Sequence, residues 1–181
     1  MKTLFYFLVL ILSLRSYAQS LVETPVEEEK MNLRHIMGFQ ALDFTTGLNQ
    51  YGRQFSFGYS RLENEKLMER ILISSETGKI NLTGYTTNYL ILELNHTVYK
   101  IKDVLFFNLG YGVLTGDETT SNEVINNKTN TFSYGLLLDV NSEIYLLRRF
   151  VLLIEFKEIW DNGSSFGPFR YYGNAGLRFY L

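Results

Sequence analysis

Charged side chains recur inside apolar runs in the second half of this chain, where each alternates with aliphatic or aromatic residues. Charged groups in such surroundings either pair with one another or carry protons or ions, because an unpaired charge away from water is costly. We predict that they pair across a narrow interior, and a proton or ion path is the alternative. These residues are Glu93, Asp139, Glu143, Glu155, Lys157, Arg170 and Arg178.

Nucleophilic catalysis has few candidate residues here. A catalytic serine needs a base within hydrogen-bonding reach. Ser164 and Ser165 have no histidine near them in the sequence. His96 has no evident acidic partner, and His35 precedes the first predicted strand. With two histidines and no cysteine, a transition-metal site is also unsupported. The sequence therefore predicts no catalytic, cofactor-binding or metal-binding residues, although a lipid-modifying enzyme stays open as an alternative.

The elements that must position the charged residues are β-strands, because side chains two residues apart share one face of a strand. In the segment 169–181 the odd positions are largely apolar, whereas the even positions include Arg170 and Arg178. Similar alternation recurs along the chain, less regularly in the first and third segments. The predicted strands are 36–47, 53–62, 66–74, 85–100, 104–116, 131–146, 149–161 and 169–181.

The predicted connections fall into two alternating sets. Those at 63–65, 102–103 and 147–148 are very short, whereas the others are longer or more polar. The longer connections are 48–52, 75–84, 117–130 and 161–168. Short turns at one rim, longer loops at the other and an even strand count are typical of bacterial outer-membrane proteins. The sequence predicts an all-β fold, an eight-stranded antiparallel up-and-down transmembrane β-barrel.

A soluble barrel of the lipocalin type would show the same alternation with its apolar face turned inward. The membrane interpretation is favoured because one face carries large Leu and Phe while the other combines charges with glycines, which suits a narrow polar interior. Aromatic residues also gather near the ends of the runs, as interfacial girdles do. These aromatic residues are Tyr89, Tyr99, Tyr111, Tyr145, Phe150, Trp160, Phe169 and Tyr180.

The N-terminal residues have the three parts of a secretion signal. Lys2 is followed by an apolar run over 4–12 and by Ser16-Tyr17-Ala18, which offers small residues for cleavage after Ala18. We predict a signal peptide at 1–18, a flexible periplasmic segment at 19–35 and the barrel domain at 36–181. A membrane-anchoring helix is the alternative, but the apolar run is too short to cross a bilayer. The protein is expected in the bacterial outer membrane, in contact with its lipid.

The charge balance argues against direct nucleic-acid binding. Removal of Lys2 and Arg15 with the signal peptide takes the formal net charge from −2 to −4. Phosphate binding needs clustered Lys and Arg, and no such cluster is evident. At the other end, Asn174-x-Gly176-x-x-Phe179-x-Leu181 resembles the C-terminal signal that the barrel-assembly machinery recognises, so that machinery is an expected partner.

Several segments of the second half occur in the same order as in a known family. They are 106–110, 114–119, 132–135, 143–146, 151–153, 163–167 and 173–179. In this order and spacing the chain resembles the TraO family of conjugative-transposon proteins over roughly residues 36–181, most closely after residue 104. Residues 67–85 depart more from the family pattern.

The resemblance implies a Bacteroidetes outer-membrane component of a conjugative DNA-transfer apparatus, similar to a type IV secretion system. It implies a structural or accessory role through contacts with other conjugation proteins, without catalysis and without DNA passing through this narrow barrel. Gly110, Gly116, Gly163 and Gly167 are expected to act through backbone conformation and close packing. The alternative function is a general small outer-membrane barrel for envelope stability or adhesion.

Overall fold

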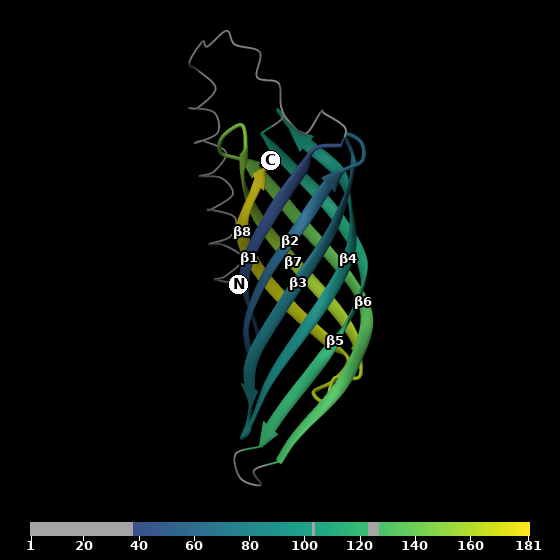
Figure 1. Cartoon of the computed structure of the whole chain (residues 1–181). Coiled ribbons are helices and arrows are strands. Elements are labelled where there is room, and N and C mark those ends of the chain that lie inside the picture. The colour runs from purple at the N-terminus through teal and green to yellow at the C-terminus, as the bar shows by residue number, and fades with distance from the viewer. Residues whose placement is uncertain (1–37, 103, 123–126) are drawn as a thin grey trace. The chain divides into compact units, whose positions relative to one another are not determined.

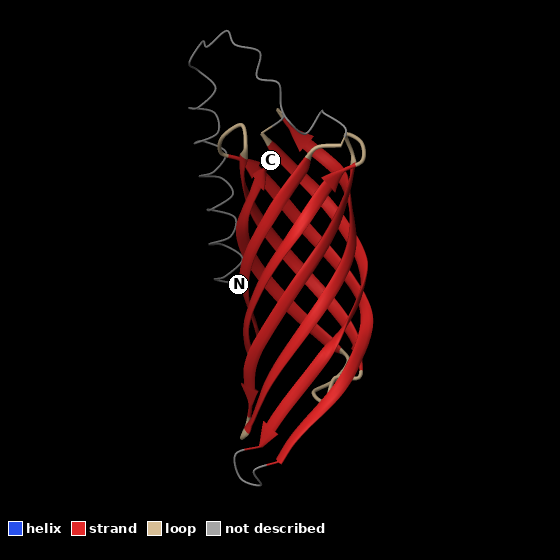
Figure 2. Ribbon diagram, in the orientation of Figure 1, coloured by secondary structure: helices blue, strands red, loops and turns tan. Residues whose placement is uncertain are grey.

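The computed structural model describes residues 38–102, 104–122 and 127–181, and this part forms one closed β-barrel (Figures 1 and 2). Each strand pairs antiparallel with the next, and the first pairs with the last. The predicted eight-stranded up-and-down barrel is therefore confirmed. The strands are β1 (Gln40–Asn49), β2 (Gly52–Leu62), β3 (Leu67–Ile80), β4 (Thr83–Ile101), β5 (Leu105–Asn122), β6 (Asn127–Tyr145), β7 (Phe150–Asn162) and β8 (Phe169–Tyr180).

The predicted orientation of the two faces is also confirmed. Leu136 and Leu138 on β6 are 54% and 58% exposed, whereas Glu143 on the same strand is 1% exposed. Arg178 on β8 is likewise buried inside the barrel. An apolar exterior around a polar interior is stable where the exterior meets hydrocarbon, so this barrel spans a membrane.

The aromatic girdle is smaller than predicted. The predicted residues that are exposed on the outer surface near strand ends, as a girdle requires, are Tyr99, Phe150, Trp160 and Phe169. Tyr111 is also outward but lies opposite Leu138 in the middle of the barrel. Tyr145 is half-buried against Tyr180. Tyr89 and Tyr180 instead point into the barrel and are 1% and 0% exposed. Each is separated by an even number of residues from an inward charged residue on its own strand, so it shares the inner face with that residue. Its distance from the strand end does not affect this direction.

Two predicted connections, 75–84 and 117–130, are wrong, because most of their residues extend the strands. β3 runs to Ile80, and β5 and β6 pair as far as Asn122 and Asn127. These extensions are rich in Thr, Asn and Ser, which carry little apolar alternation but still complete the backbone ladder with their neighbours. The hairpins β3–β4 and β5–β6 consequently project together beyond the other strands (Figure 1).

The two rims of the barrel differ. One holds the connections β2–β3, β4–β5 and β6–β7 and both ends of the described barrel, where the Leu181 N–H donates to the Gln40 carbonyl. The other holds the two-residue turns that follow β1 and β3, the extended ends of β3 to β6 and the longest connection, between β7 and β8. Outer-membrane barrels place their longer loops outside the cell. We therefore call the rim with the ends of the described barrel the periplasmic rim and the other the extracellular rim.

Other predictions concern residues outside the described range. The signal peptide at 1–18, the segment 19–35 and His35 lie there, and β1 is described from Gln40 onward. Within the described residues, no helix is long and apolar enough to cross a membrane.

Candidate functional site: the ion-paired interior

Arg70 lies at the centre of a buried ion network in the periplasmic half of the barrel. Its Nε lies 2.9 Å from Asp43 Oδ2, its Nη1 lies 3.0 Å from Glu93 Oε1, and its Nη2 lies 2.7 Å from Glu155 Oε1. These partners come from β1, β4 and β7, so a single guanidinium spans the interior. Its strand neighbours Glu69 and Ile71 are outward, which fixes Arg70 inward.

Two further cations complete this central network. Arg178 binds Asp43 with both Nε and Nη2, at 2.6 and 2.8 Å, and its Nη1 lies 2.8 Å from Glu143 Oε1. The Lys157 Nζ lies 3.1 Å from Glu155 Oε2. All of these side chains are almost completely buried. Hydrogen bonds to charged partners offset the cost of removing the charges from water.

A second ion network lies near the extracellular rim, around Arg170 of β8. The Arg170 Nη1 lies 3.0 Å from Glu76 Oε2, and its Nη2 contacts Glu118. The Tyr172 hydroxyl also donates to Glu76 Oε2, at 2.5 Å. Glu76 and Glu118 lie on the strand extensions that the sequence predicted as loops, and both are fully buried.

The β7–β8 loop covers this extracellular network. The backbone N–H of Ser165 donates to Glu118 Oε1 at 2.8 Å, and the Ser164 hydroxyl donates to Glu118 Oε2 at 3.1 Å. The ring of Phe166 packs against that of Tyr85, with 5.1 Å between centroids. The loop is therefore attached to the inner face of the strand extensions.

This attachment gives a testable expectation for the loop. Phe166→Ala removes the ring contact with Tyr85 and is expected to raise the rate of limited proteolysis within Gly163–Pro168 several-fold, while the barrel itself resists digestion. Phe169→Ala, which truncates an outward ring, is the control. Equal cleavage of the wild type and Phe166→Ala would contradict the contact's role.

Two apolar layers interrupt the polar interior. One, at the periplasmic rim, contains Ala41, Leu62, Met68, Val151, Leu153 and Tyr180. The other contains Leu72, Tyr89, Ile91, Leu114, Leu137, Ile159 and Tyr172, and along β3 to β8 it falls between the two ion networks. Between these networks the described residues would offer an ion only the hydroxyl and amide groups of residues such as Ser56 and Gln54, with no charged side chain among them. The geometry therefore favours the predicted ion pairing over an ion path.

Every charged residue predicted to face the interior does so. Arg170 belongs to the extracellular network and the others to the central one. Sequence reasoning missed further members, because the first and third strands were irregular and the extensions were assigned to loops. The missed residues are Asp43, Arg70, Glu76, Glu118 and Asp161. For Asp43, the available signal was its position between the apolar residues Leu42 and Phe44.

The serine and histidine candidates are far apart. Ser164 lies in the extracellular loop and contacts Glu118 and Arg170. His96 faces outward on β4 and is paired with Leu67, the first residue of β3 at the periplasmic rim. A serine and a base at opposite rims cannot form a nucleophile–base pair.

Gly110 packs directly against the central network. A Cβ at this position would lie 2.8 Å from Asn95 Oδ1 and 2.9 Å from Glu93 Oε1. Gly110→Val is expected to lower the free energy of unfolding by about 1–3 kcal/mol, because the added methyl groups displace hydrogen-bonded side chains. Urea unfolding in lipid vesicles measures this change in the free energy of unfolding. Gly173→Val, where a Cβ would meet nothing within 4 Å, is the matched control and should be near neutral.

The other glycines expected to pack closely divide into two kinds. A Cβ on Gly116 would lie 1.9 Å from the Asn88 carbonyl oxygen, so close strand approach requires glycine there. Gly163 and Gly167 have φ of 137° and 105°, which glycine adopts without strain.

Comparison with known proteins supports the same class of fold. No protein-family model matches the chain, and no curated protein matches it in sequence. Its fold is similar to that of neisserial surface protein A, with a TM-score of 0.66, 11% identity, and coverage of 78% of this chain and 96% of that one. The N-terminal barrel of OprF from Pseudomonas aeruginosa gives a TM-score of 0.63, 8% identity, and coverage of 80% and 98%.

A third solved structure is Ail, the attachment invasion locus protein of Yersinia pestis, with a TM-score of 0.51, 12% identity, and coverage of 80% of this chain and 100% of that one. At these identities the likeness is one of fold. The closed sheet, apolar exterior and ion-paired interior define the protein as a small β-barrel of the outer-membrane type.

Proposed function

We propose that the protein is a non-catalytic, non-conducting outer-membrane barrel that acts in envelope stability or adhesion through contacts at its extracellular rim. The observation that carries this proposal is the sheet extension formed by β3 to β6, which projects from a closed barrel. A barrel without an open lumen has no passage to offer, so its function falls to its surfaces.

The extension presents ordered polar groups on its outer face. The Ser75 hydroxyl donates to Asn88 Oδ1 at 3.0 Å, and Asn88 Nδ2 lies 3.4 Å from Asp117 Oδ2. Two residues closer to the tip of the β5–β6 hairpin, the Thr119 hydroxyl donates to Asn130. Hydroxyl and amide side chains held at strand spacing suit hydrogen bonding to a polar surface.

The experiment is excision of the tip of the β5–β6 hairpin. Removal of residues 119–130 and connection of Glu118 to Thr131 by Asn-Gly keeps the pairing below the cut, because these two residues are cross-strand partners. This variant keeps the row of Ser75, Asn88 and Asp117 but lacks the rows beyond it. Cells with it should therefore fall between the wild type and a deletion strain in adhesion or envelope integrity. Wild-type behaviour of the excised strain would count against the proposal. In planar bilayers both proteins should give no stable conductance.

A second candidate function is an accessory role in conjugative DNA transfer. The resemblance to the TraO family supports it, through segments that fall on β5 to β8 and the β7–β8 loop. Deletion of the gene from a conjugative element should lower the mating frequency, and the full-length gene should restore it. An unchanged mating frequency with weakened envelope integrity would support the first proposal alone.

Export and assembly belong to the same proposal. Cleavage after Ala18 would make Gln19 the first residue of the mature chain, which intact-mass measurement of the membrane-extracted protein tests. Recognition of the C-terminal strand by the barrel-assembly machinery predicts that Phe179→Ala slows membrane insertion in cells. Phe179 lies outside the ion networks, and its ring packs against that of Phe150 with 5.0 Å between centroids, so the stability of the inserted barrel should fall by only about 1 kcal/mol.

A further inference from the structure

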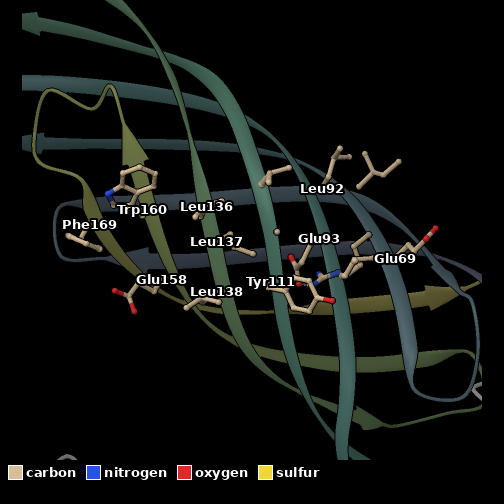
Figure 3. A pocket seen from close by; sticks show the side chains of 15 residues that line it. Glu69, Leu92, Glu93, Tyr111, Leu136, Leu137, Leu138, Glu158, Trp160 and Phe169 are labelled. Carbon is tan, nitrogen blue, oxygen red and sulfur yellow. Dashed lines mark hydrogen bonds and ion pairs between the residues drawn. The ribbon is translucent and has the colours of Figure 1, made fainter.

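A groove with a volume of about 800 Å³ lies on the outer surface and crosses from β3 to β8 (Figure 3). Its walls are two rows of outward side chains on neighbouring strands. One row begins at Ile71 and ends at Phe169, and the other begins at Glu69 and ends at Glu158. Most of its lining is apolar, and Gly112 lies between the rows without a side chain.

The groove runs obliquely across the membrane. Glu69 is the third residue of β3 from the periplasmic rim, whereas Phe169 begins β8 at the extracellular rim. Five strand spacings amount to about 24 Å across the strands, and the step from Glu69 to Ile71 adds about 7 Å along β3. With strands tilted by about 40°, these two displacements rise about 20 Å along the membrane normal. One leaflet contributes about 15 Å of hydrocarbon, so the groove can hold an acyl chain from the periplasmic leaflet to beyond the bilayer midplane.

The periplasmic end of the groove carries both signs of charge. Arg61 on β2 lies directly opposite Glu69, and both side chains are outward. Directly opposite residues have Cβ atoms about 5 Å apart. The Arg61 side chain is 54% exposed, and its ion pair with Glu63, at 3.2 Å, is also exposed. Such a pair is weak, so the guanidinium stays accessible to another anion.

The row that begins at Glu69 ends in a carboxylate with apolar neighbours. Glu158 faces outward, and its cross-strand neighbours are Leu138 and Tyr171. The outward residues before and after it on β7 are Phe156 and Trp160. Glu158 is four residues from the extracellular end of β7 and offers no cation to a head group. The cation and carboxylate at the periplasmic end therefore assign the head group of the occupant to the periplasmic leaflet.

We propose that the groove binds one zwitterionic aminophospholipid of the periplasmic leaflet, with its phosphate on Arg61, its primary ammonium on Glu69 and an acyl chain along the groove. Guanidinium binds phosphate through two parallel hydrogen bonds, and a carboxylate accepts charge-assisted hydrogen bonds from an ammonium group. A choline head group has no N–H to donate and loses the second contact. An anionic head group without an amine loses it as well.

The position of Trp160 provides a direct measurement, because it is the only tryptophan of the chain and lines the far end of the groove. Phosphatidylethanolamine with bromine near the ends of its acyl chains quenches tryptophan fluorescence on contact. In bulk lipid these chain ends stay near the midplane, away from a tryptophan close to the extracellular rim. A chain lying in the groove brings them toward Trp160.

The full-length protein is reconstituted into vesicles with equal fractions of brominated phosphatidylethanolamine, phosphatidylcholine or phosphatidylglycerol. We expect at least about threefold stronger quenching by the ethanolamine lipid, since a charge-assisted hydrogen bond is worth roughly tenfold in binding and partial exposure reduces it. Glu69→Gln and Arg61→Gln should each remove the preference. Glu65→Gln removes a carboxylate from the β2–β3 turn at the same rim and should keep it.

Gel mobility before and after heating verifies that each variant forms the barrel. Equal quenching of the wild-type protein by all three lipids would overturn the proposal. Stronger quenching by phosphatidylglycerol, or an equal loss of preference in Glu65→Gln, would also overturn it, because both results indicate general surface electrostatics in place of a site.

Discussion

Replacement of Arg70 by alanine is expected to lower the free energy of unfolding by about 3–5 kcal/mol, because removing one member of a buried ion network leaves the remaining charges uncompensated. Arg70 contacts Asp43, Glu93 and Glu155 from three other strands. Without it, the central network keeps Lys157 and Arg178 as its cations among the described residues. Urea unfolding in vesicles, followed by Trp160 fluorescence, measures the loss.

Two variants separate the network from other effects of substitution. Arg53→Ala removes an exposed guanidinium from the outer surface of β2 and should change stability by less than about 0.5 kcal/mol. Arg70→Lys keeps one charge but not the three-directional hydrogen bonding, so its stability should fall between those of the wild type and Arg70→Ala. Wild-type stability of Arg70→Ala would mean that the paired interior does not hold the barrel together.

Replacement of Leu138 by arginine is expected to cost about 2–3 kcal/mol, because a cation on the lipid face near the bilayer midplane costs about 2–4 kcal/mol and the carboxylate of Glu158, its cross-strand partner, offsets part of that cost. Leu138 is 58% exposed and lies on β6 between the two rims. The penalty has its origin in the membrane, so it should shrink when the protein is transferred from vesicles to a detergent micelle that water penetrates.

The matched control uses the same substitution at another depth. Phe132→Arg places the charge on the same face of β6, six residues nearer the extracellular rim, where the cost should fall to about 0–1 kcal/mol. An equal cost at both positions would contradict a membrane boundary between them. A stabilising effect of Leu138→Arg would contradict lipid contact altogether.

The strands inside the membrane were predictable because hydrocarbon on one side and a packed polar interior on the other impose strict alternation. Residues such as Leu136, Asp139 and Glu155 fell on the predicted faces for this reason. Outside the membrane both faces of the sheet meet water or polar groups, so the alternation disappears although the strands continue. The predicted loops at 75–84 and 117–130 were wrong at this boundary.

The composition of the ion networks was less predictable than their existence. Alternation shows that a side chain faces inward, but the identity of its partner depends on the register between strands. Arg70 contacts Glu155 across 85 positions of sequence. The residues around either position do not indicate a partner at that separation in sequence. The separation into two networks also depends on the apolar layer of Leu72 and Leu137, which becomes visible only when the strands are aligned.

The contact between the first and last strands has a consequence for biogenesis. Arg178 of β8 donates to Asp43 through two nitrogens and also to the Ser60 hydroxyl, so these contacts join β8 to β1 and β2 across 135 and 118 positions of sequence. Before β1 and β8 pair, water must solvate both charged groups. Pairing of the two strands therefore replaces that water with buried charge-assisted hydrogen bonds, which couples closure of the sheet to dehydration of its interior.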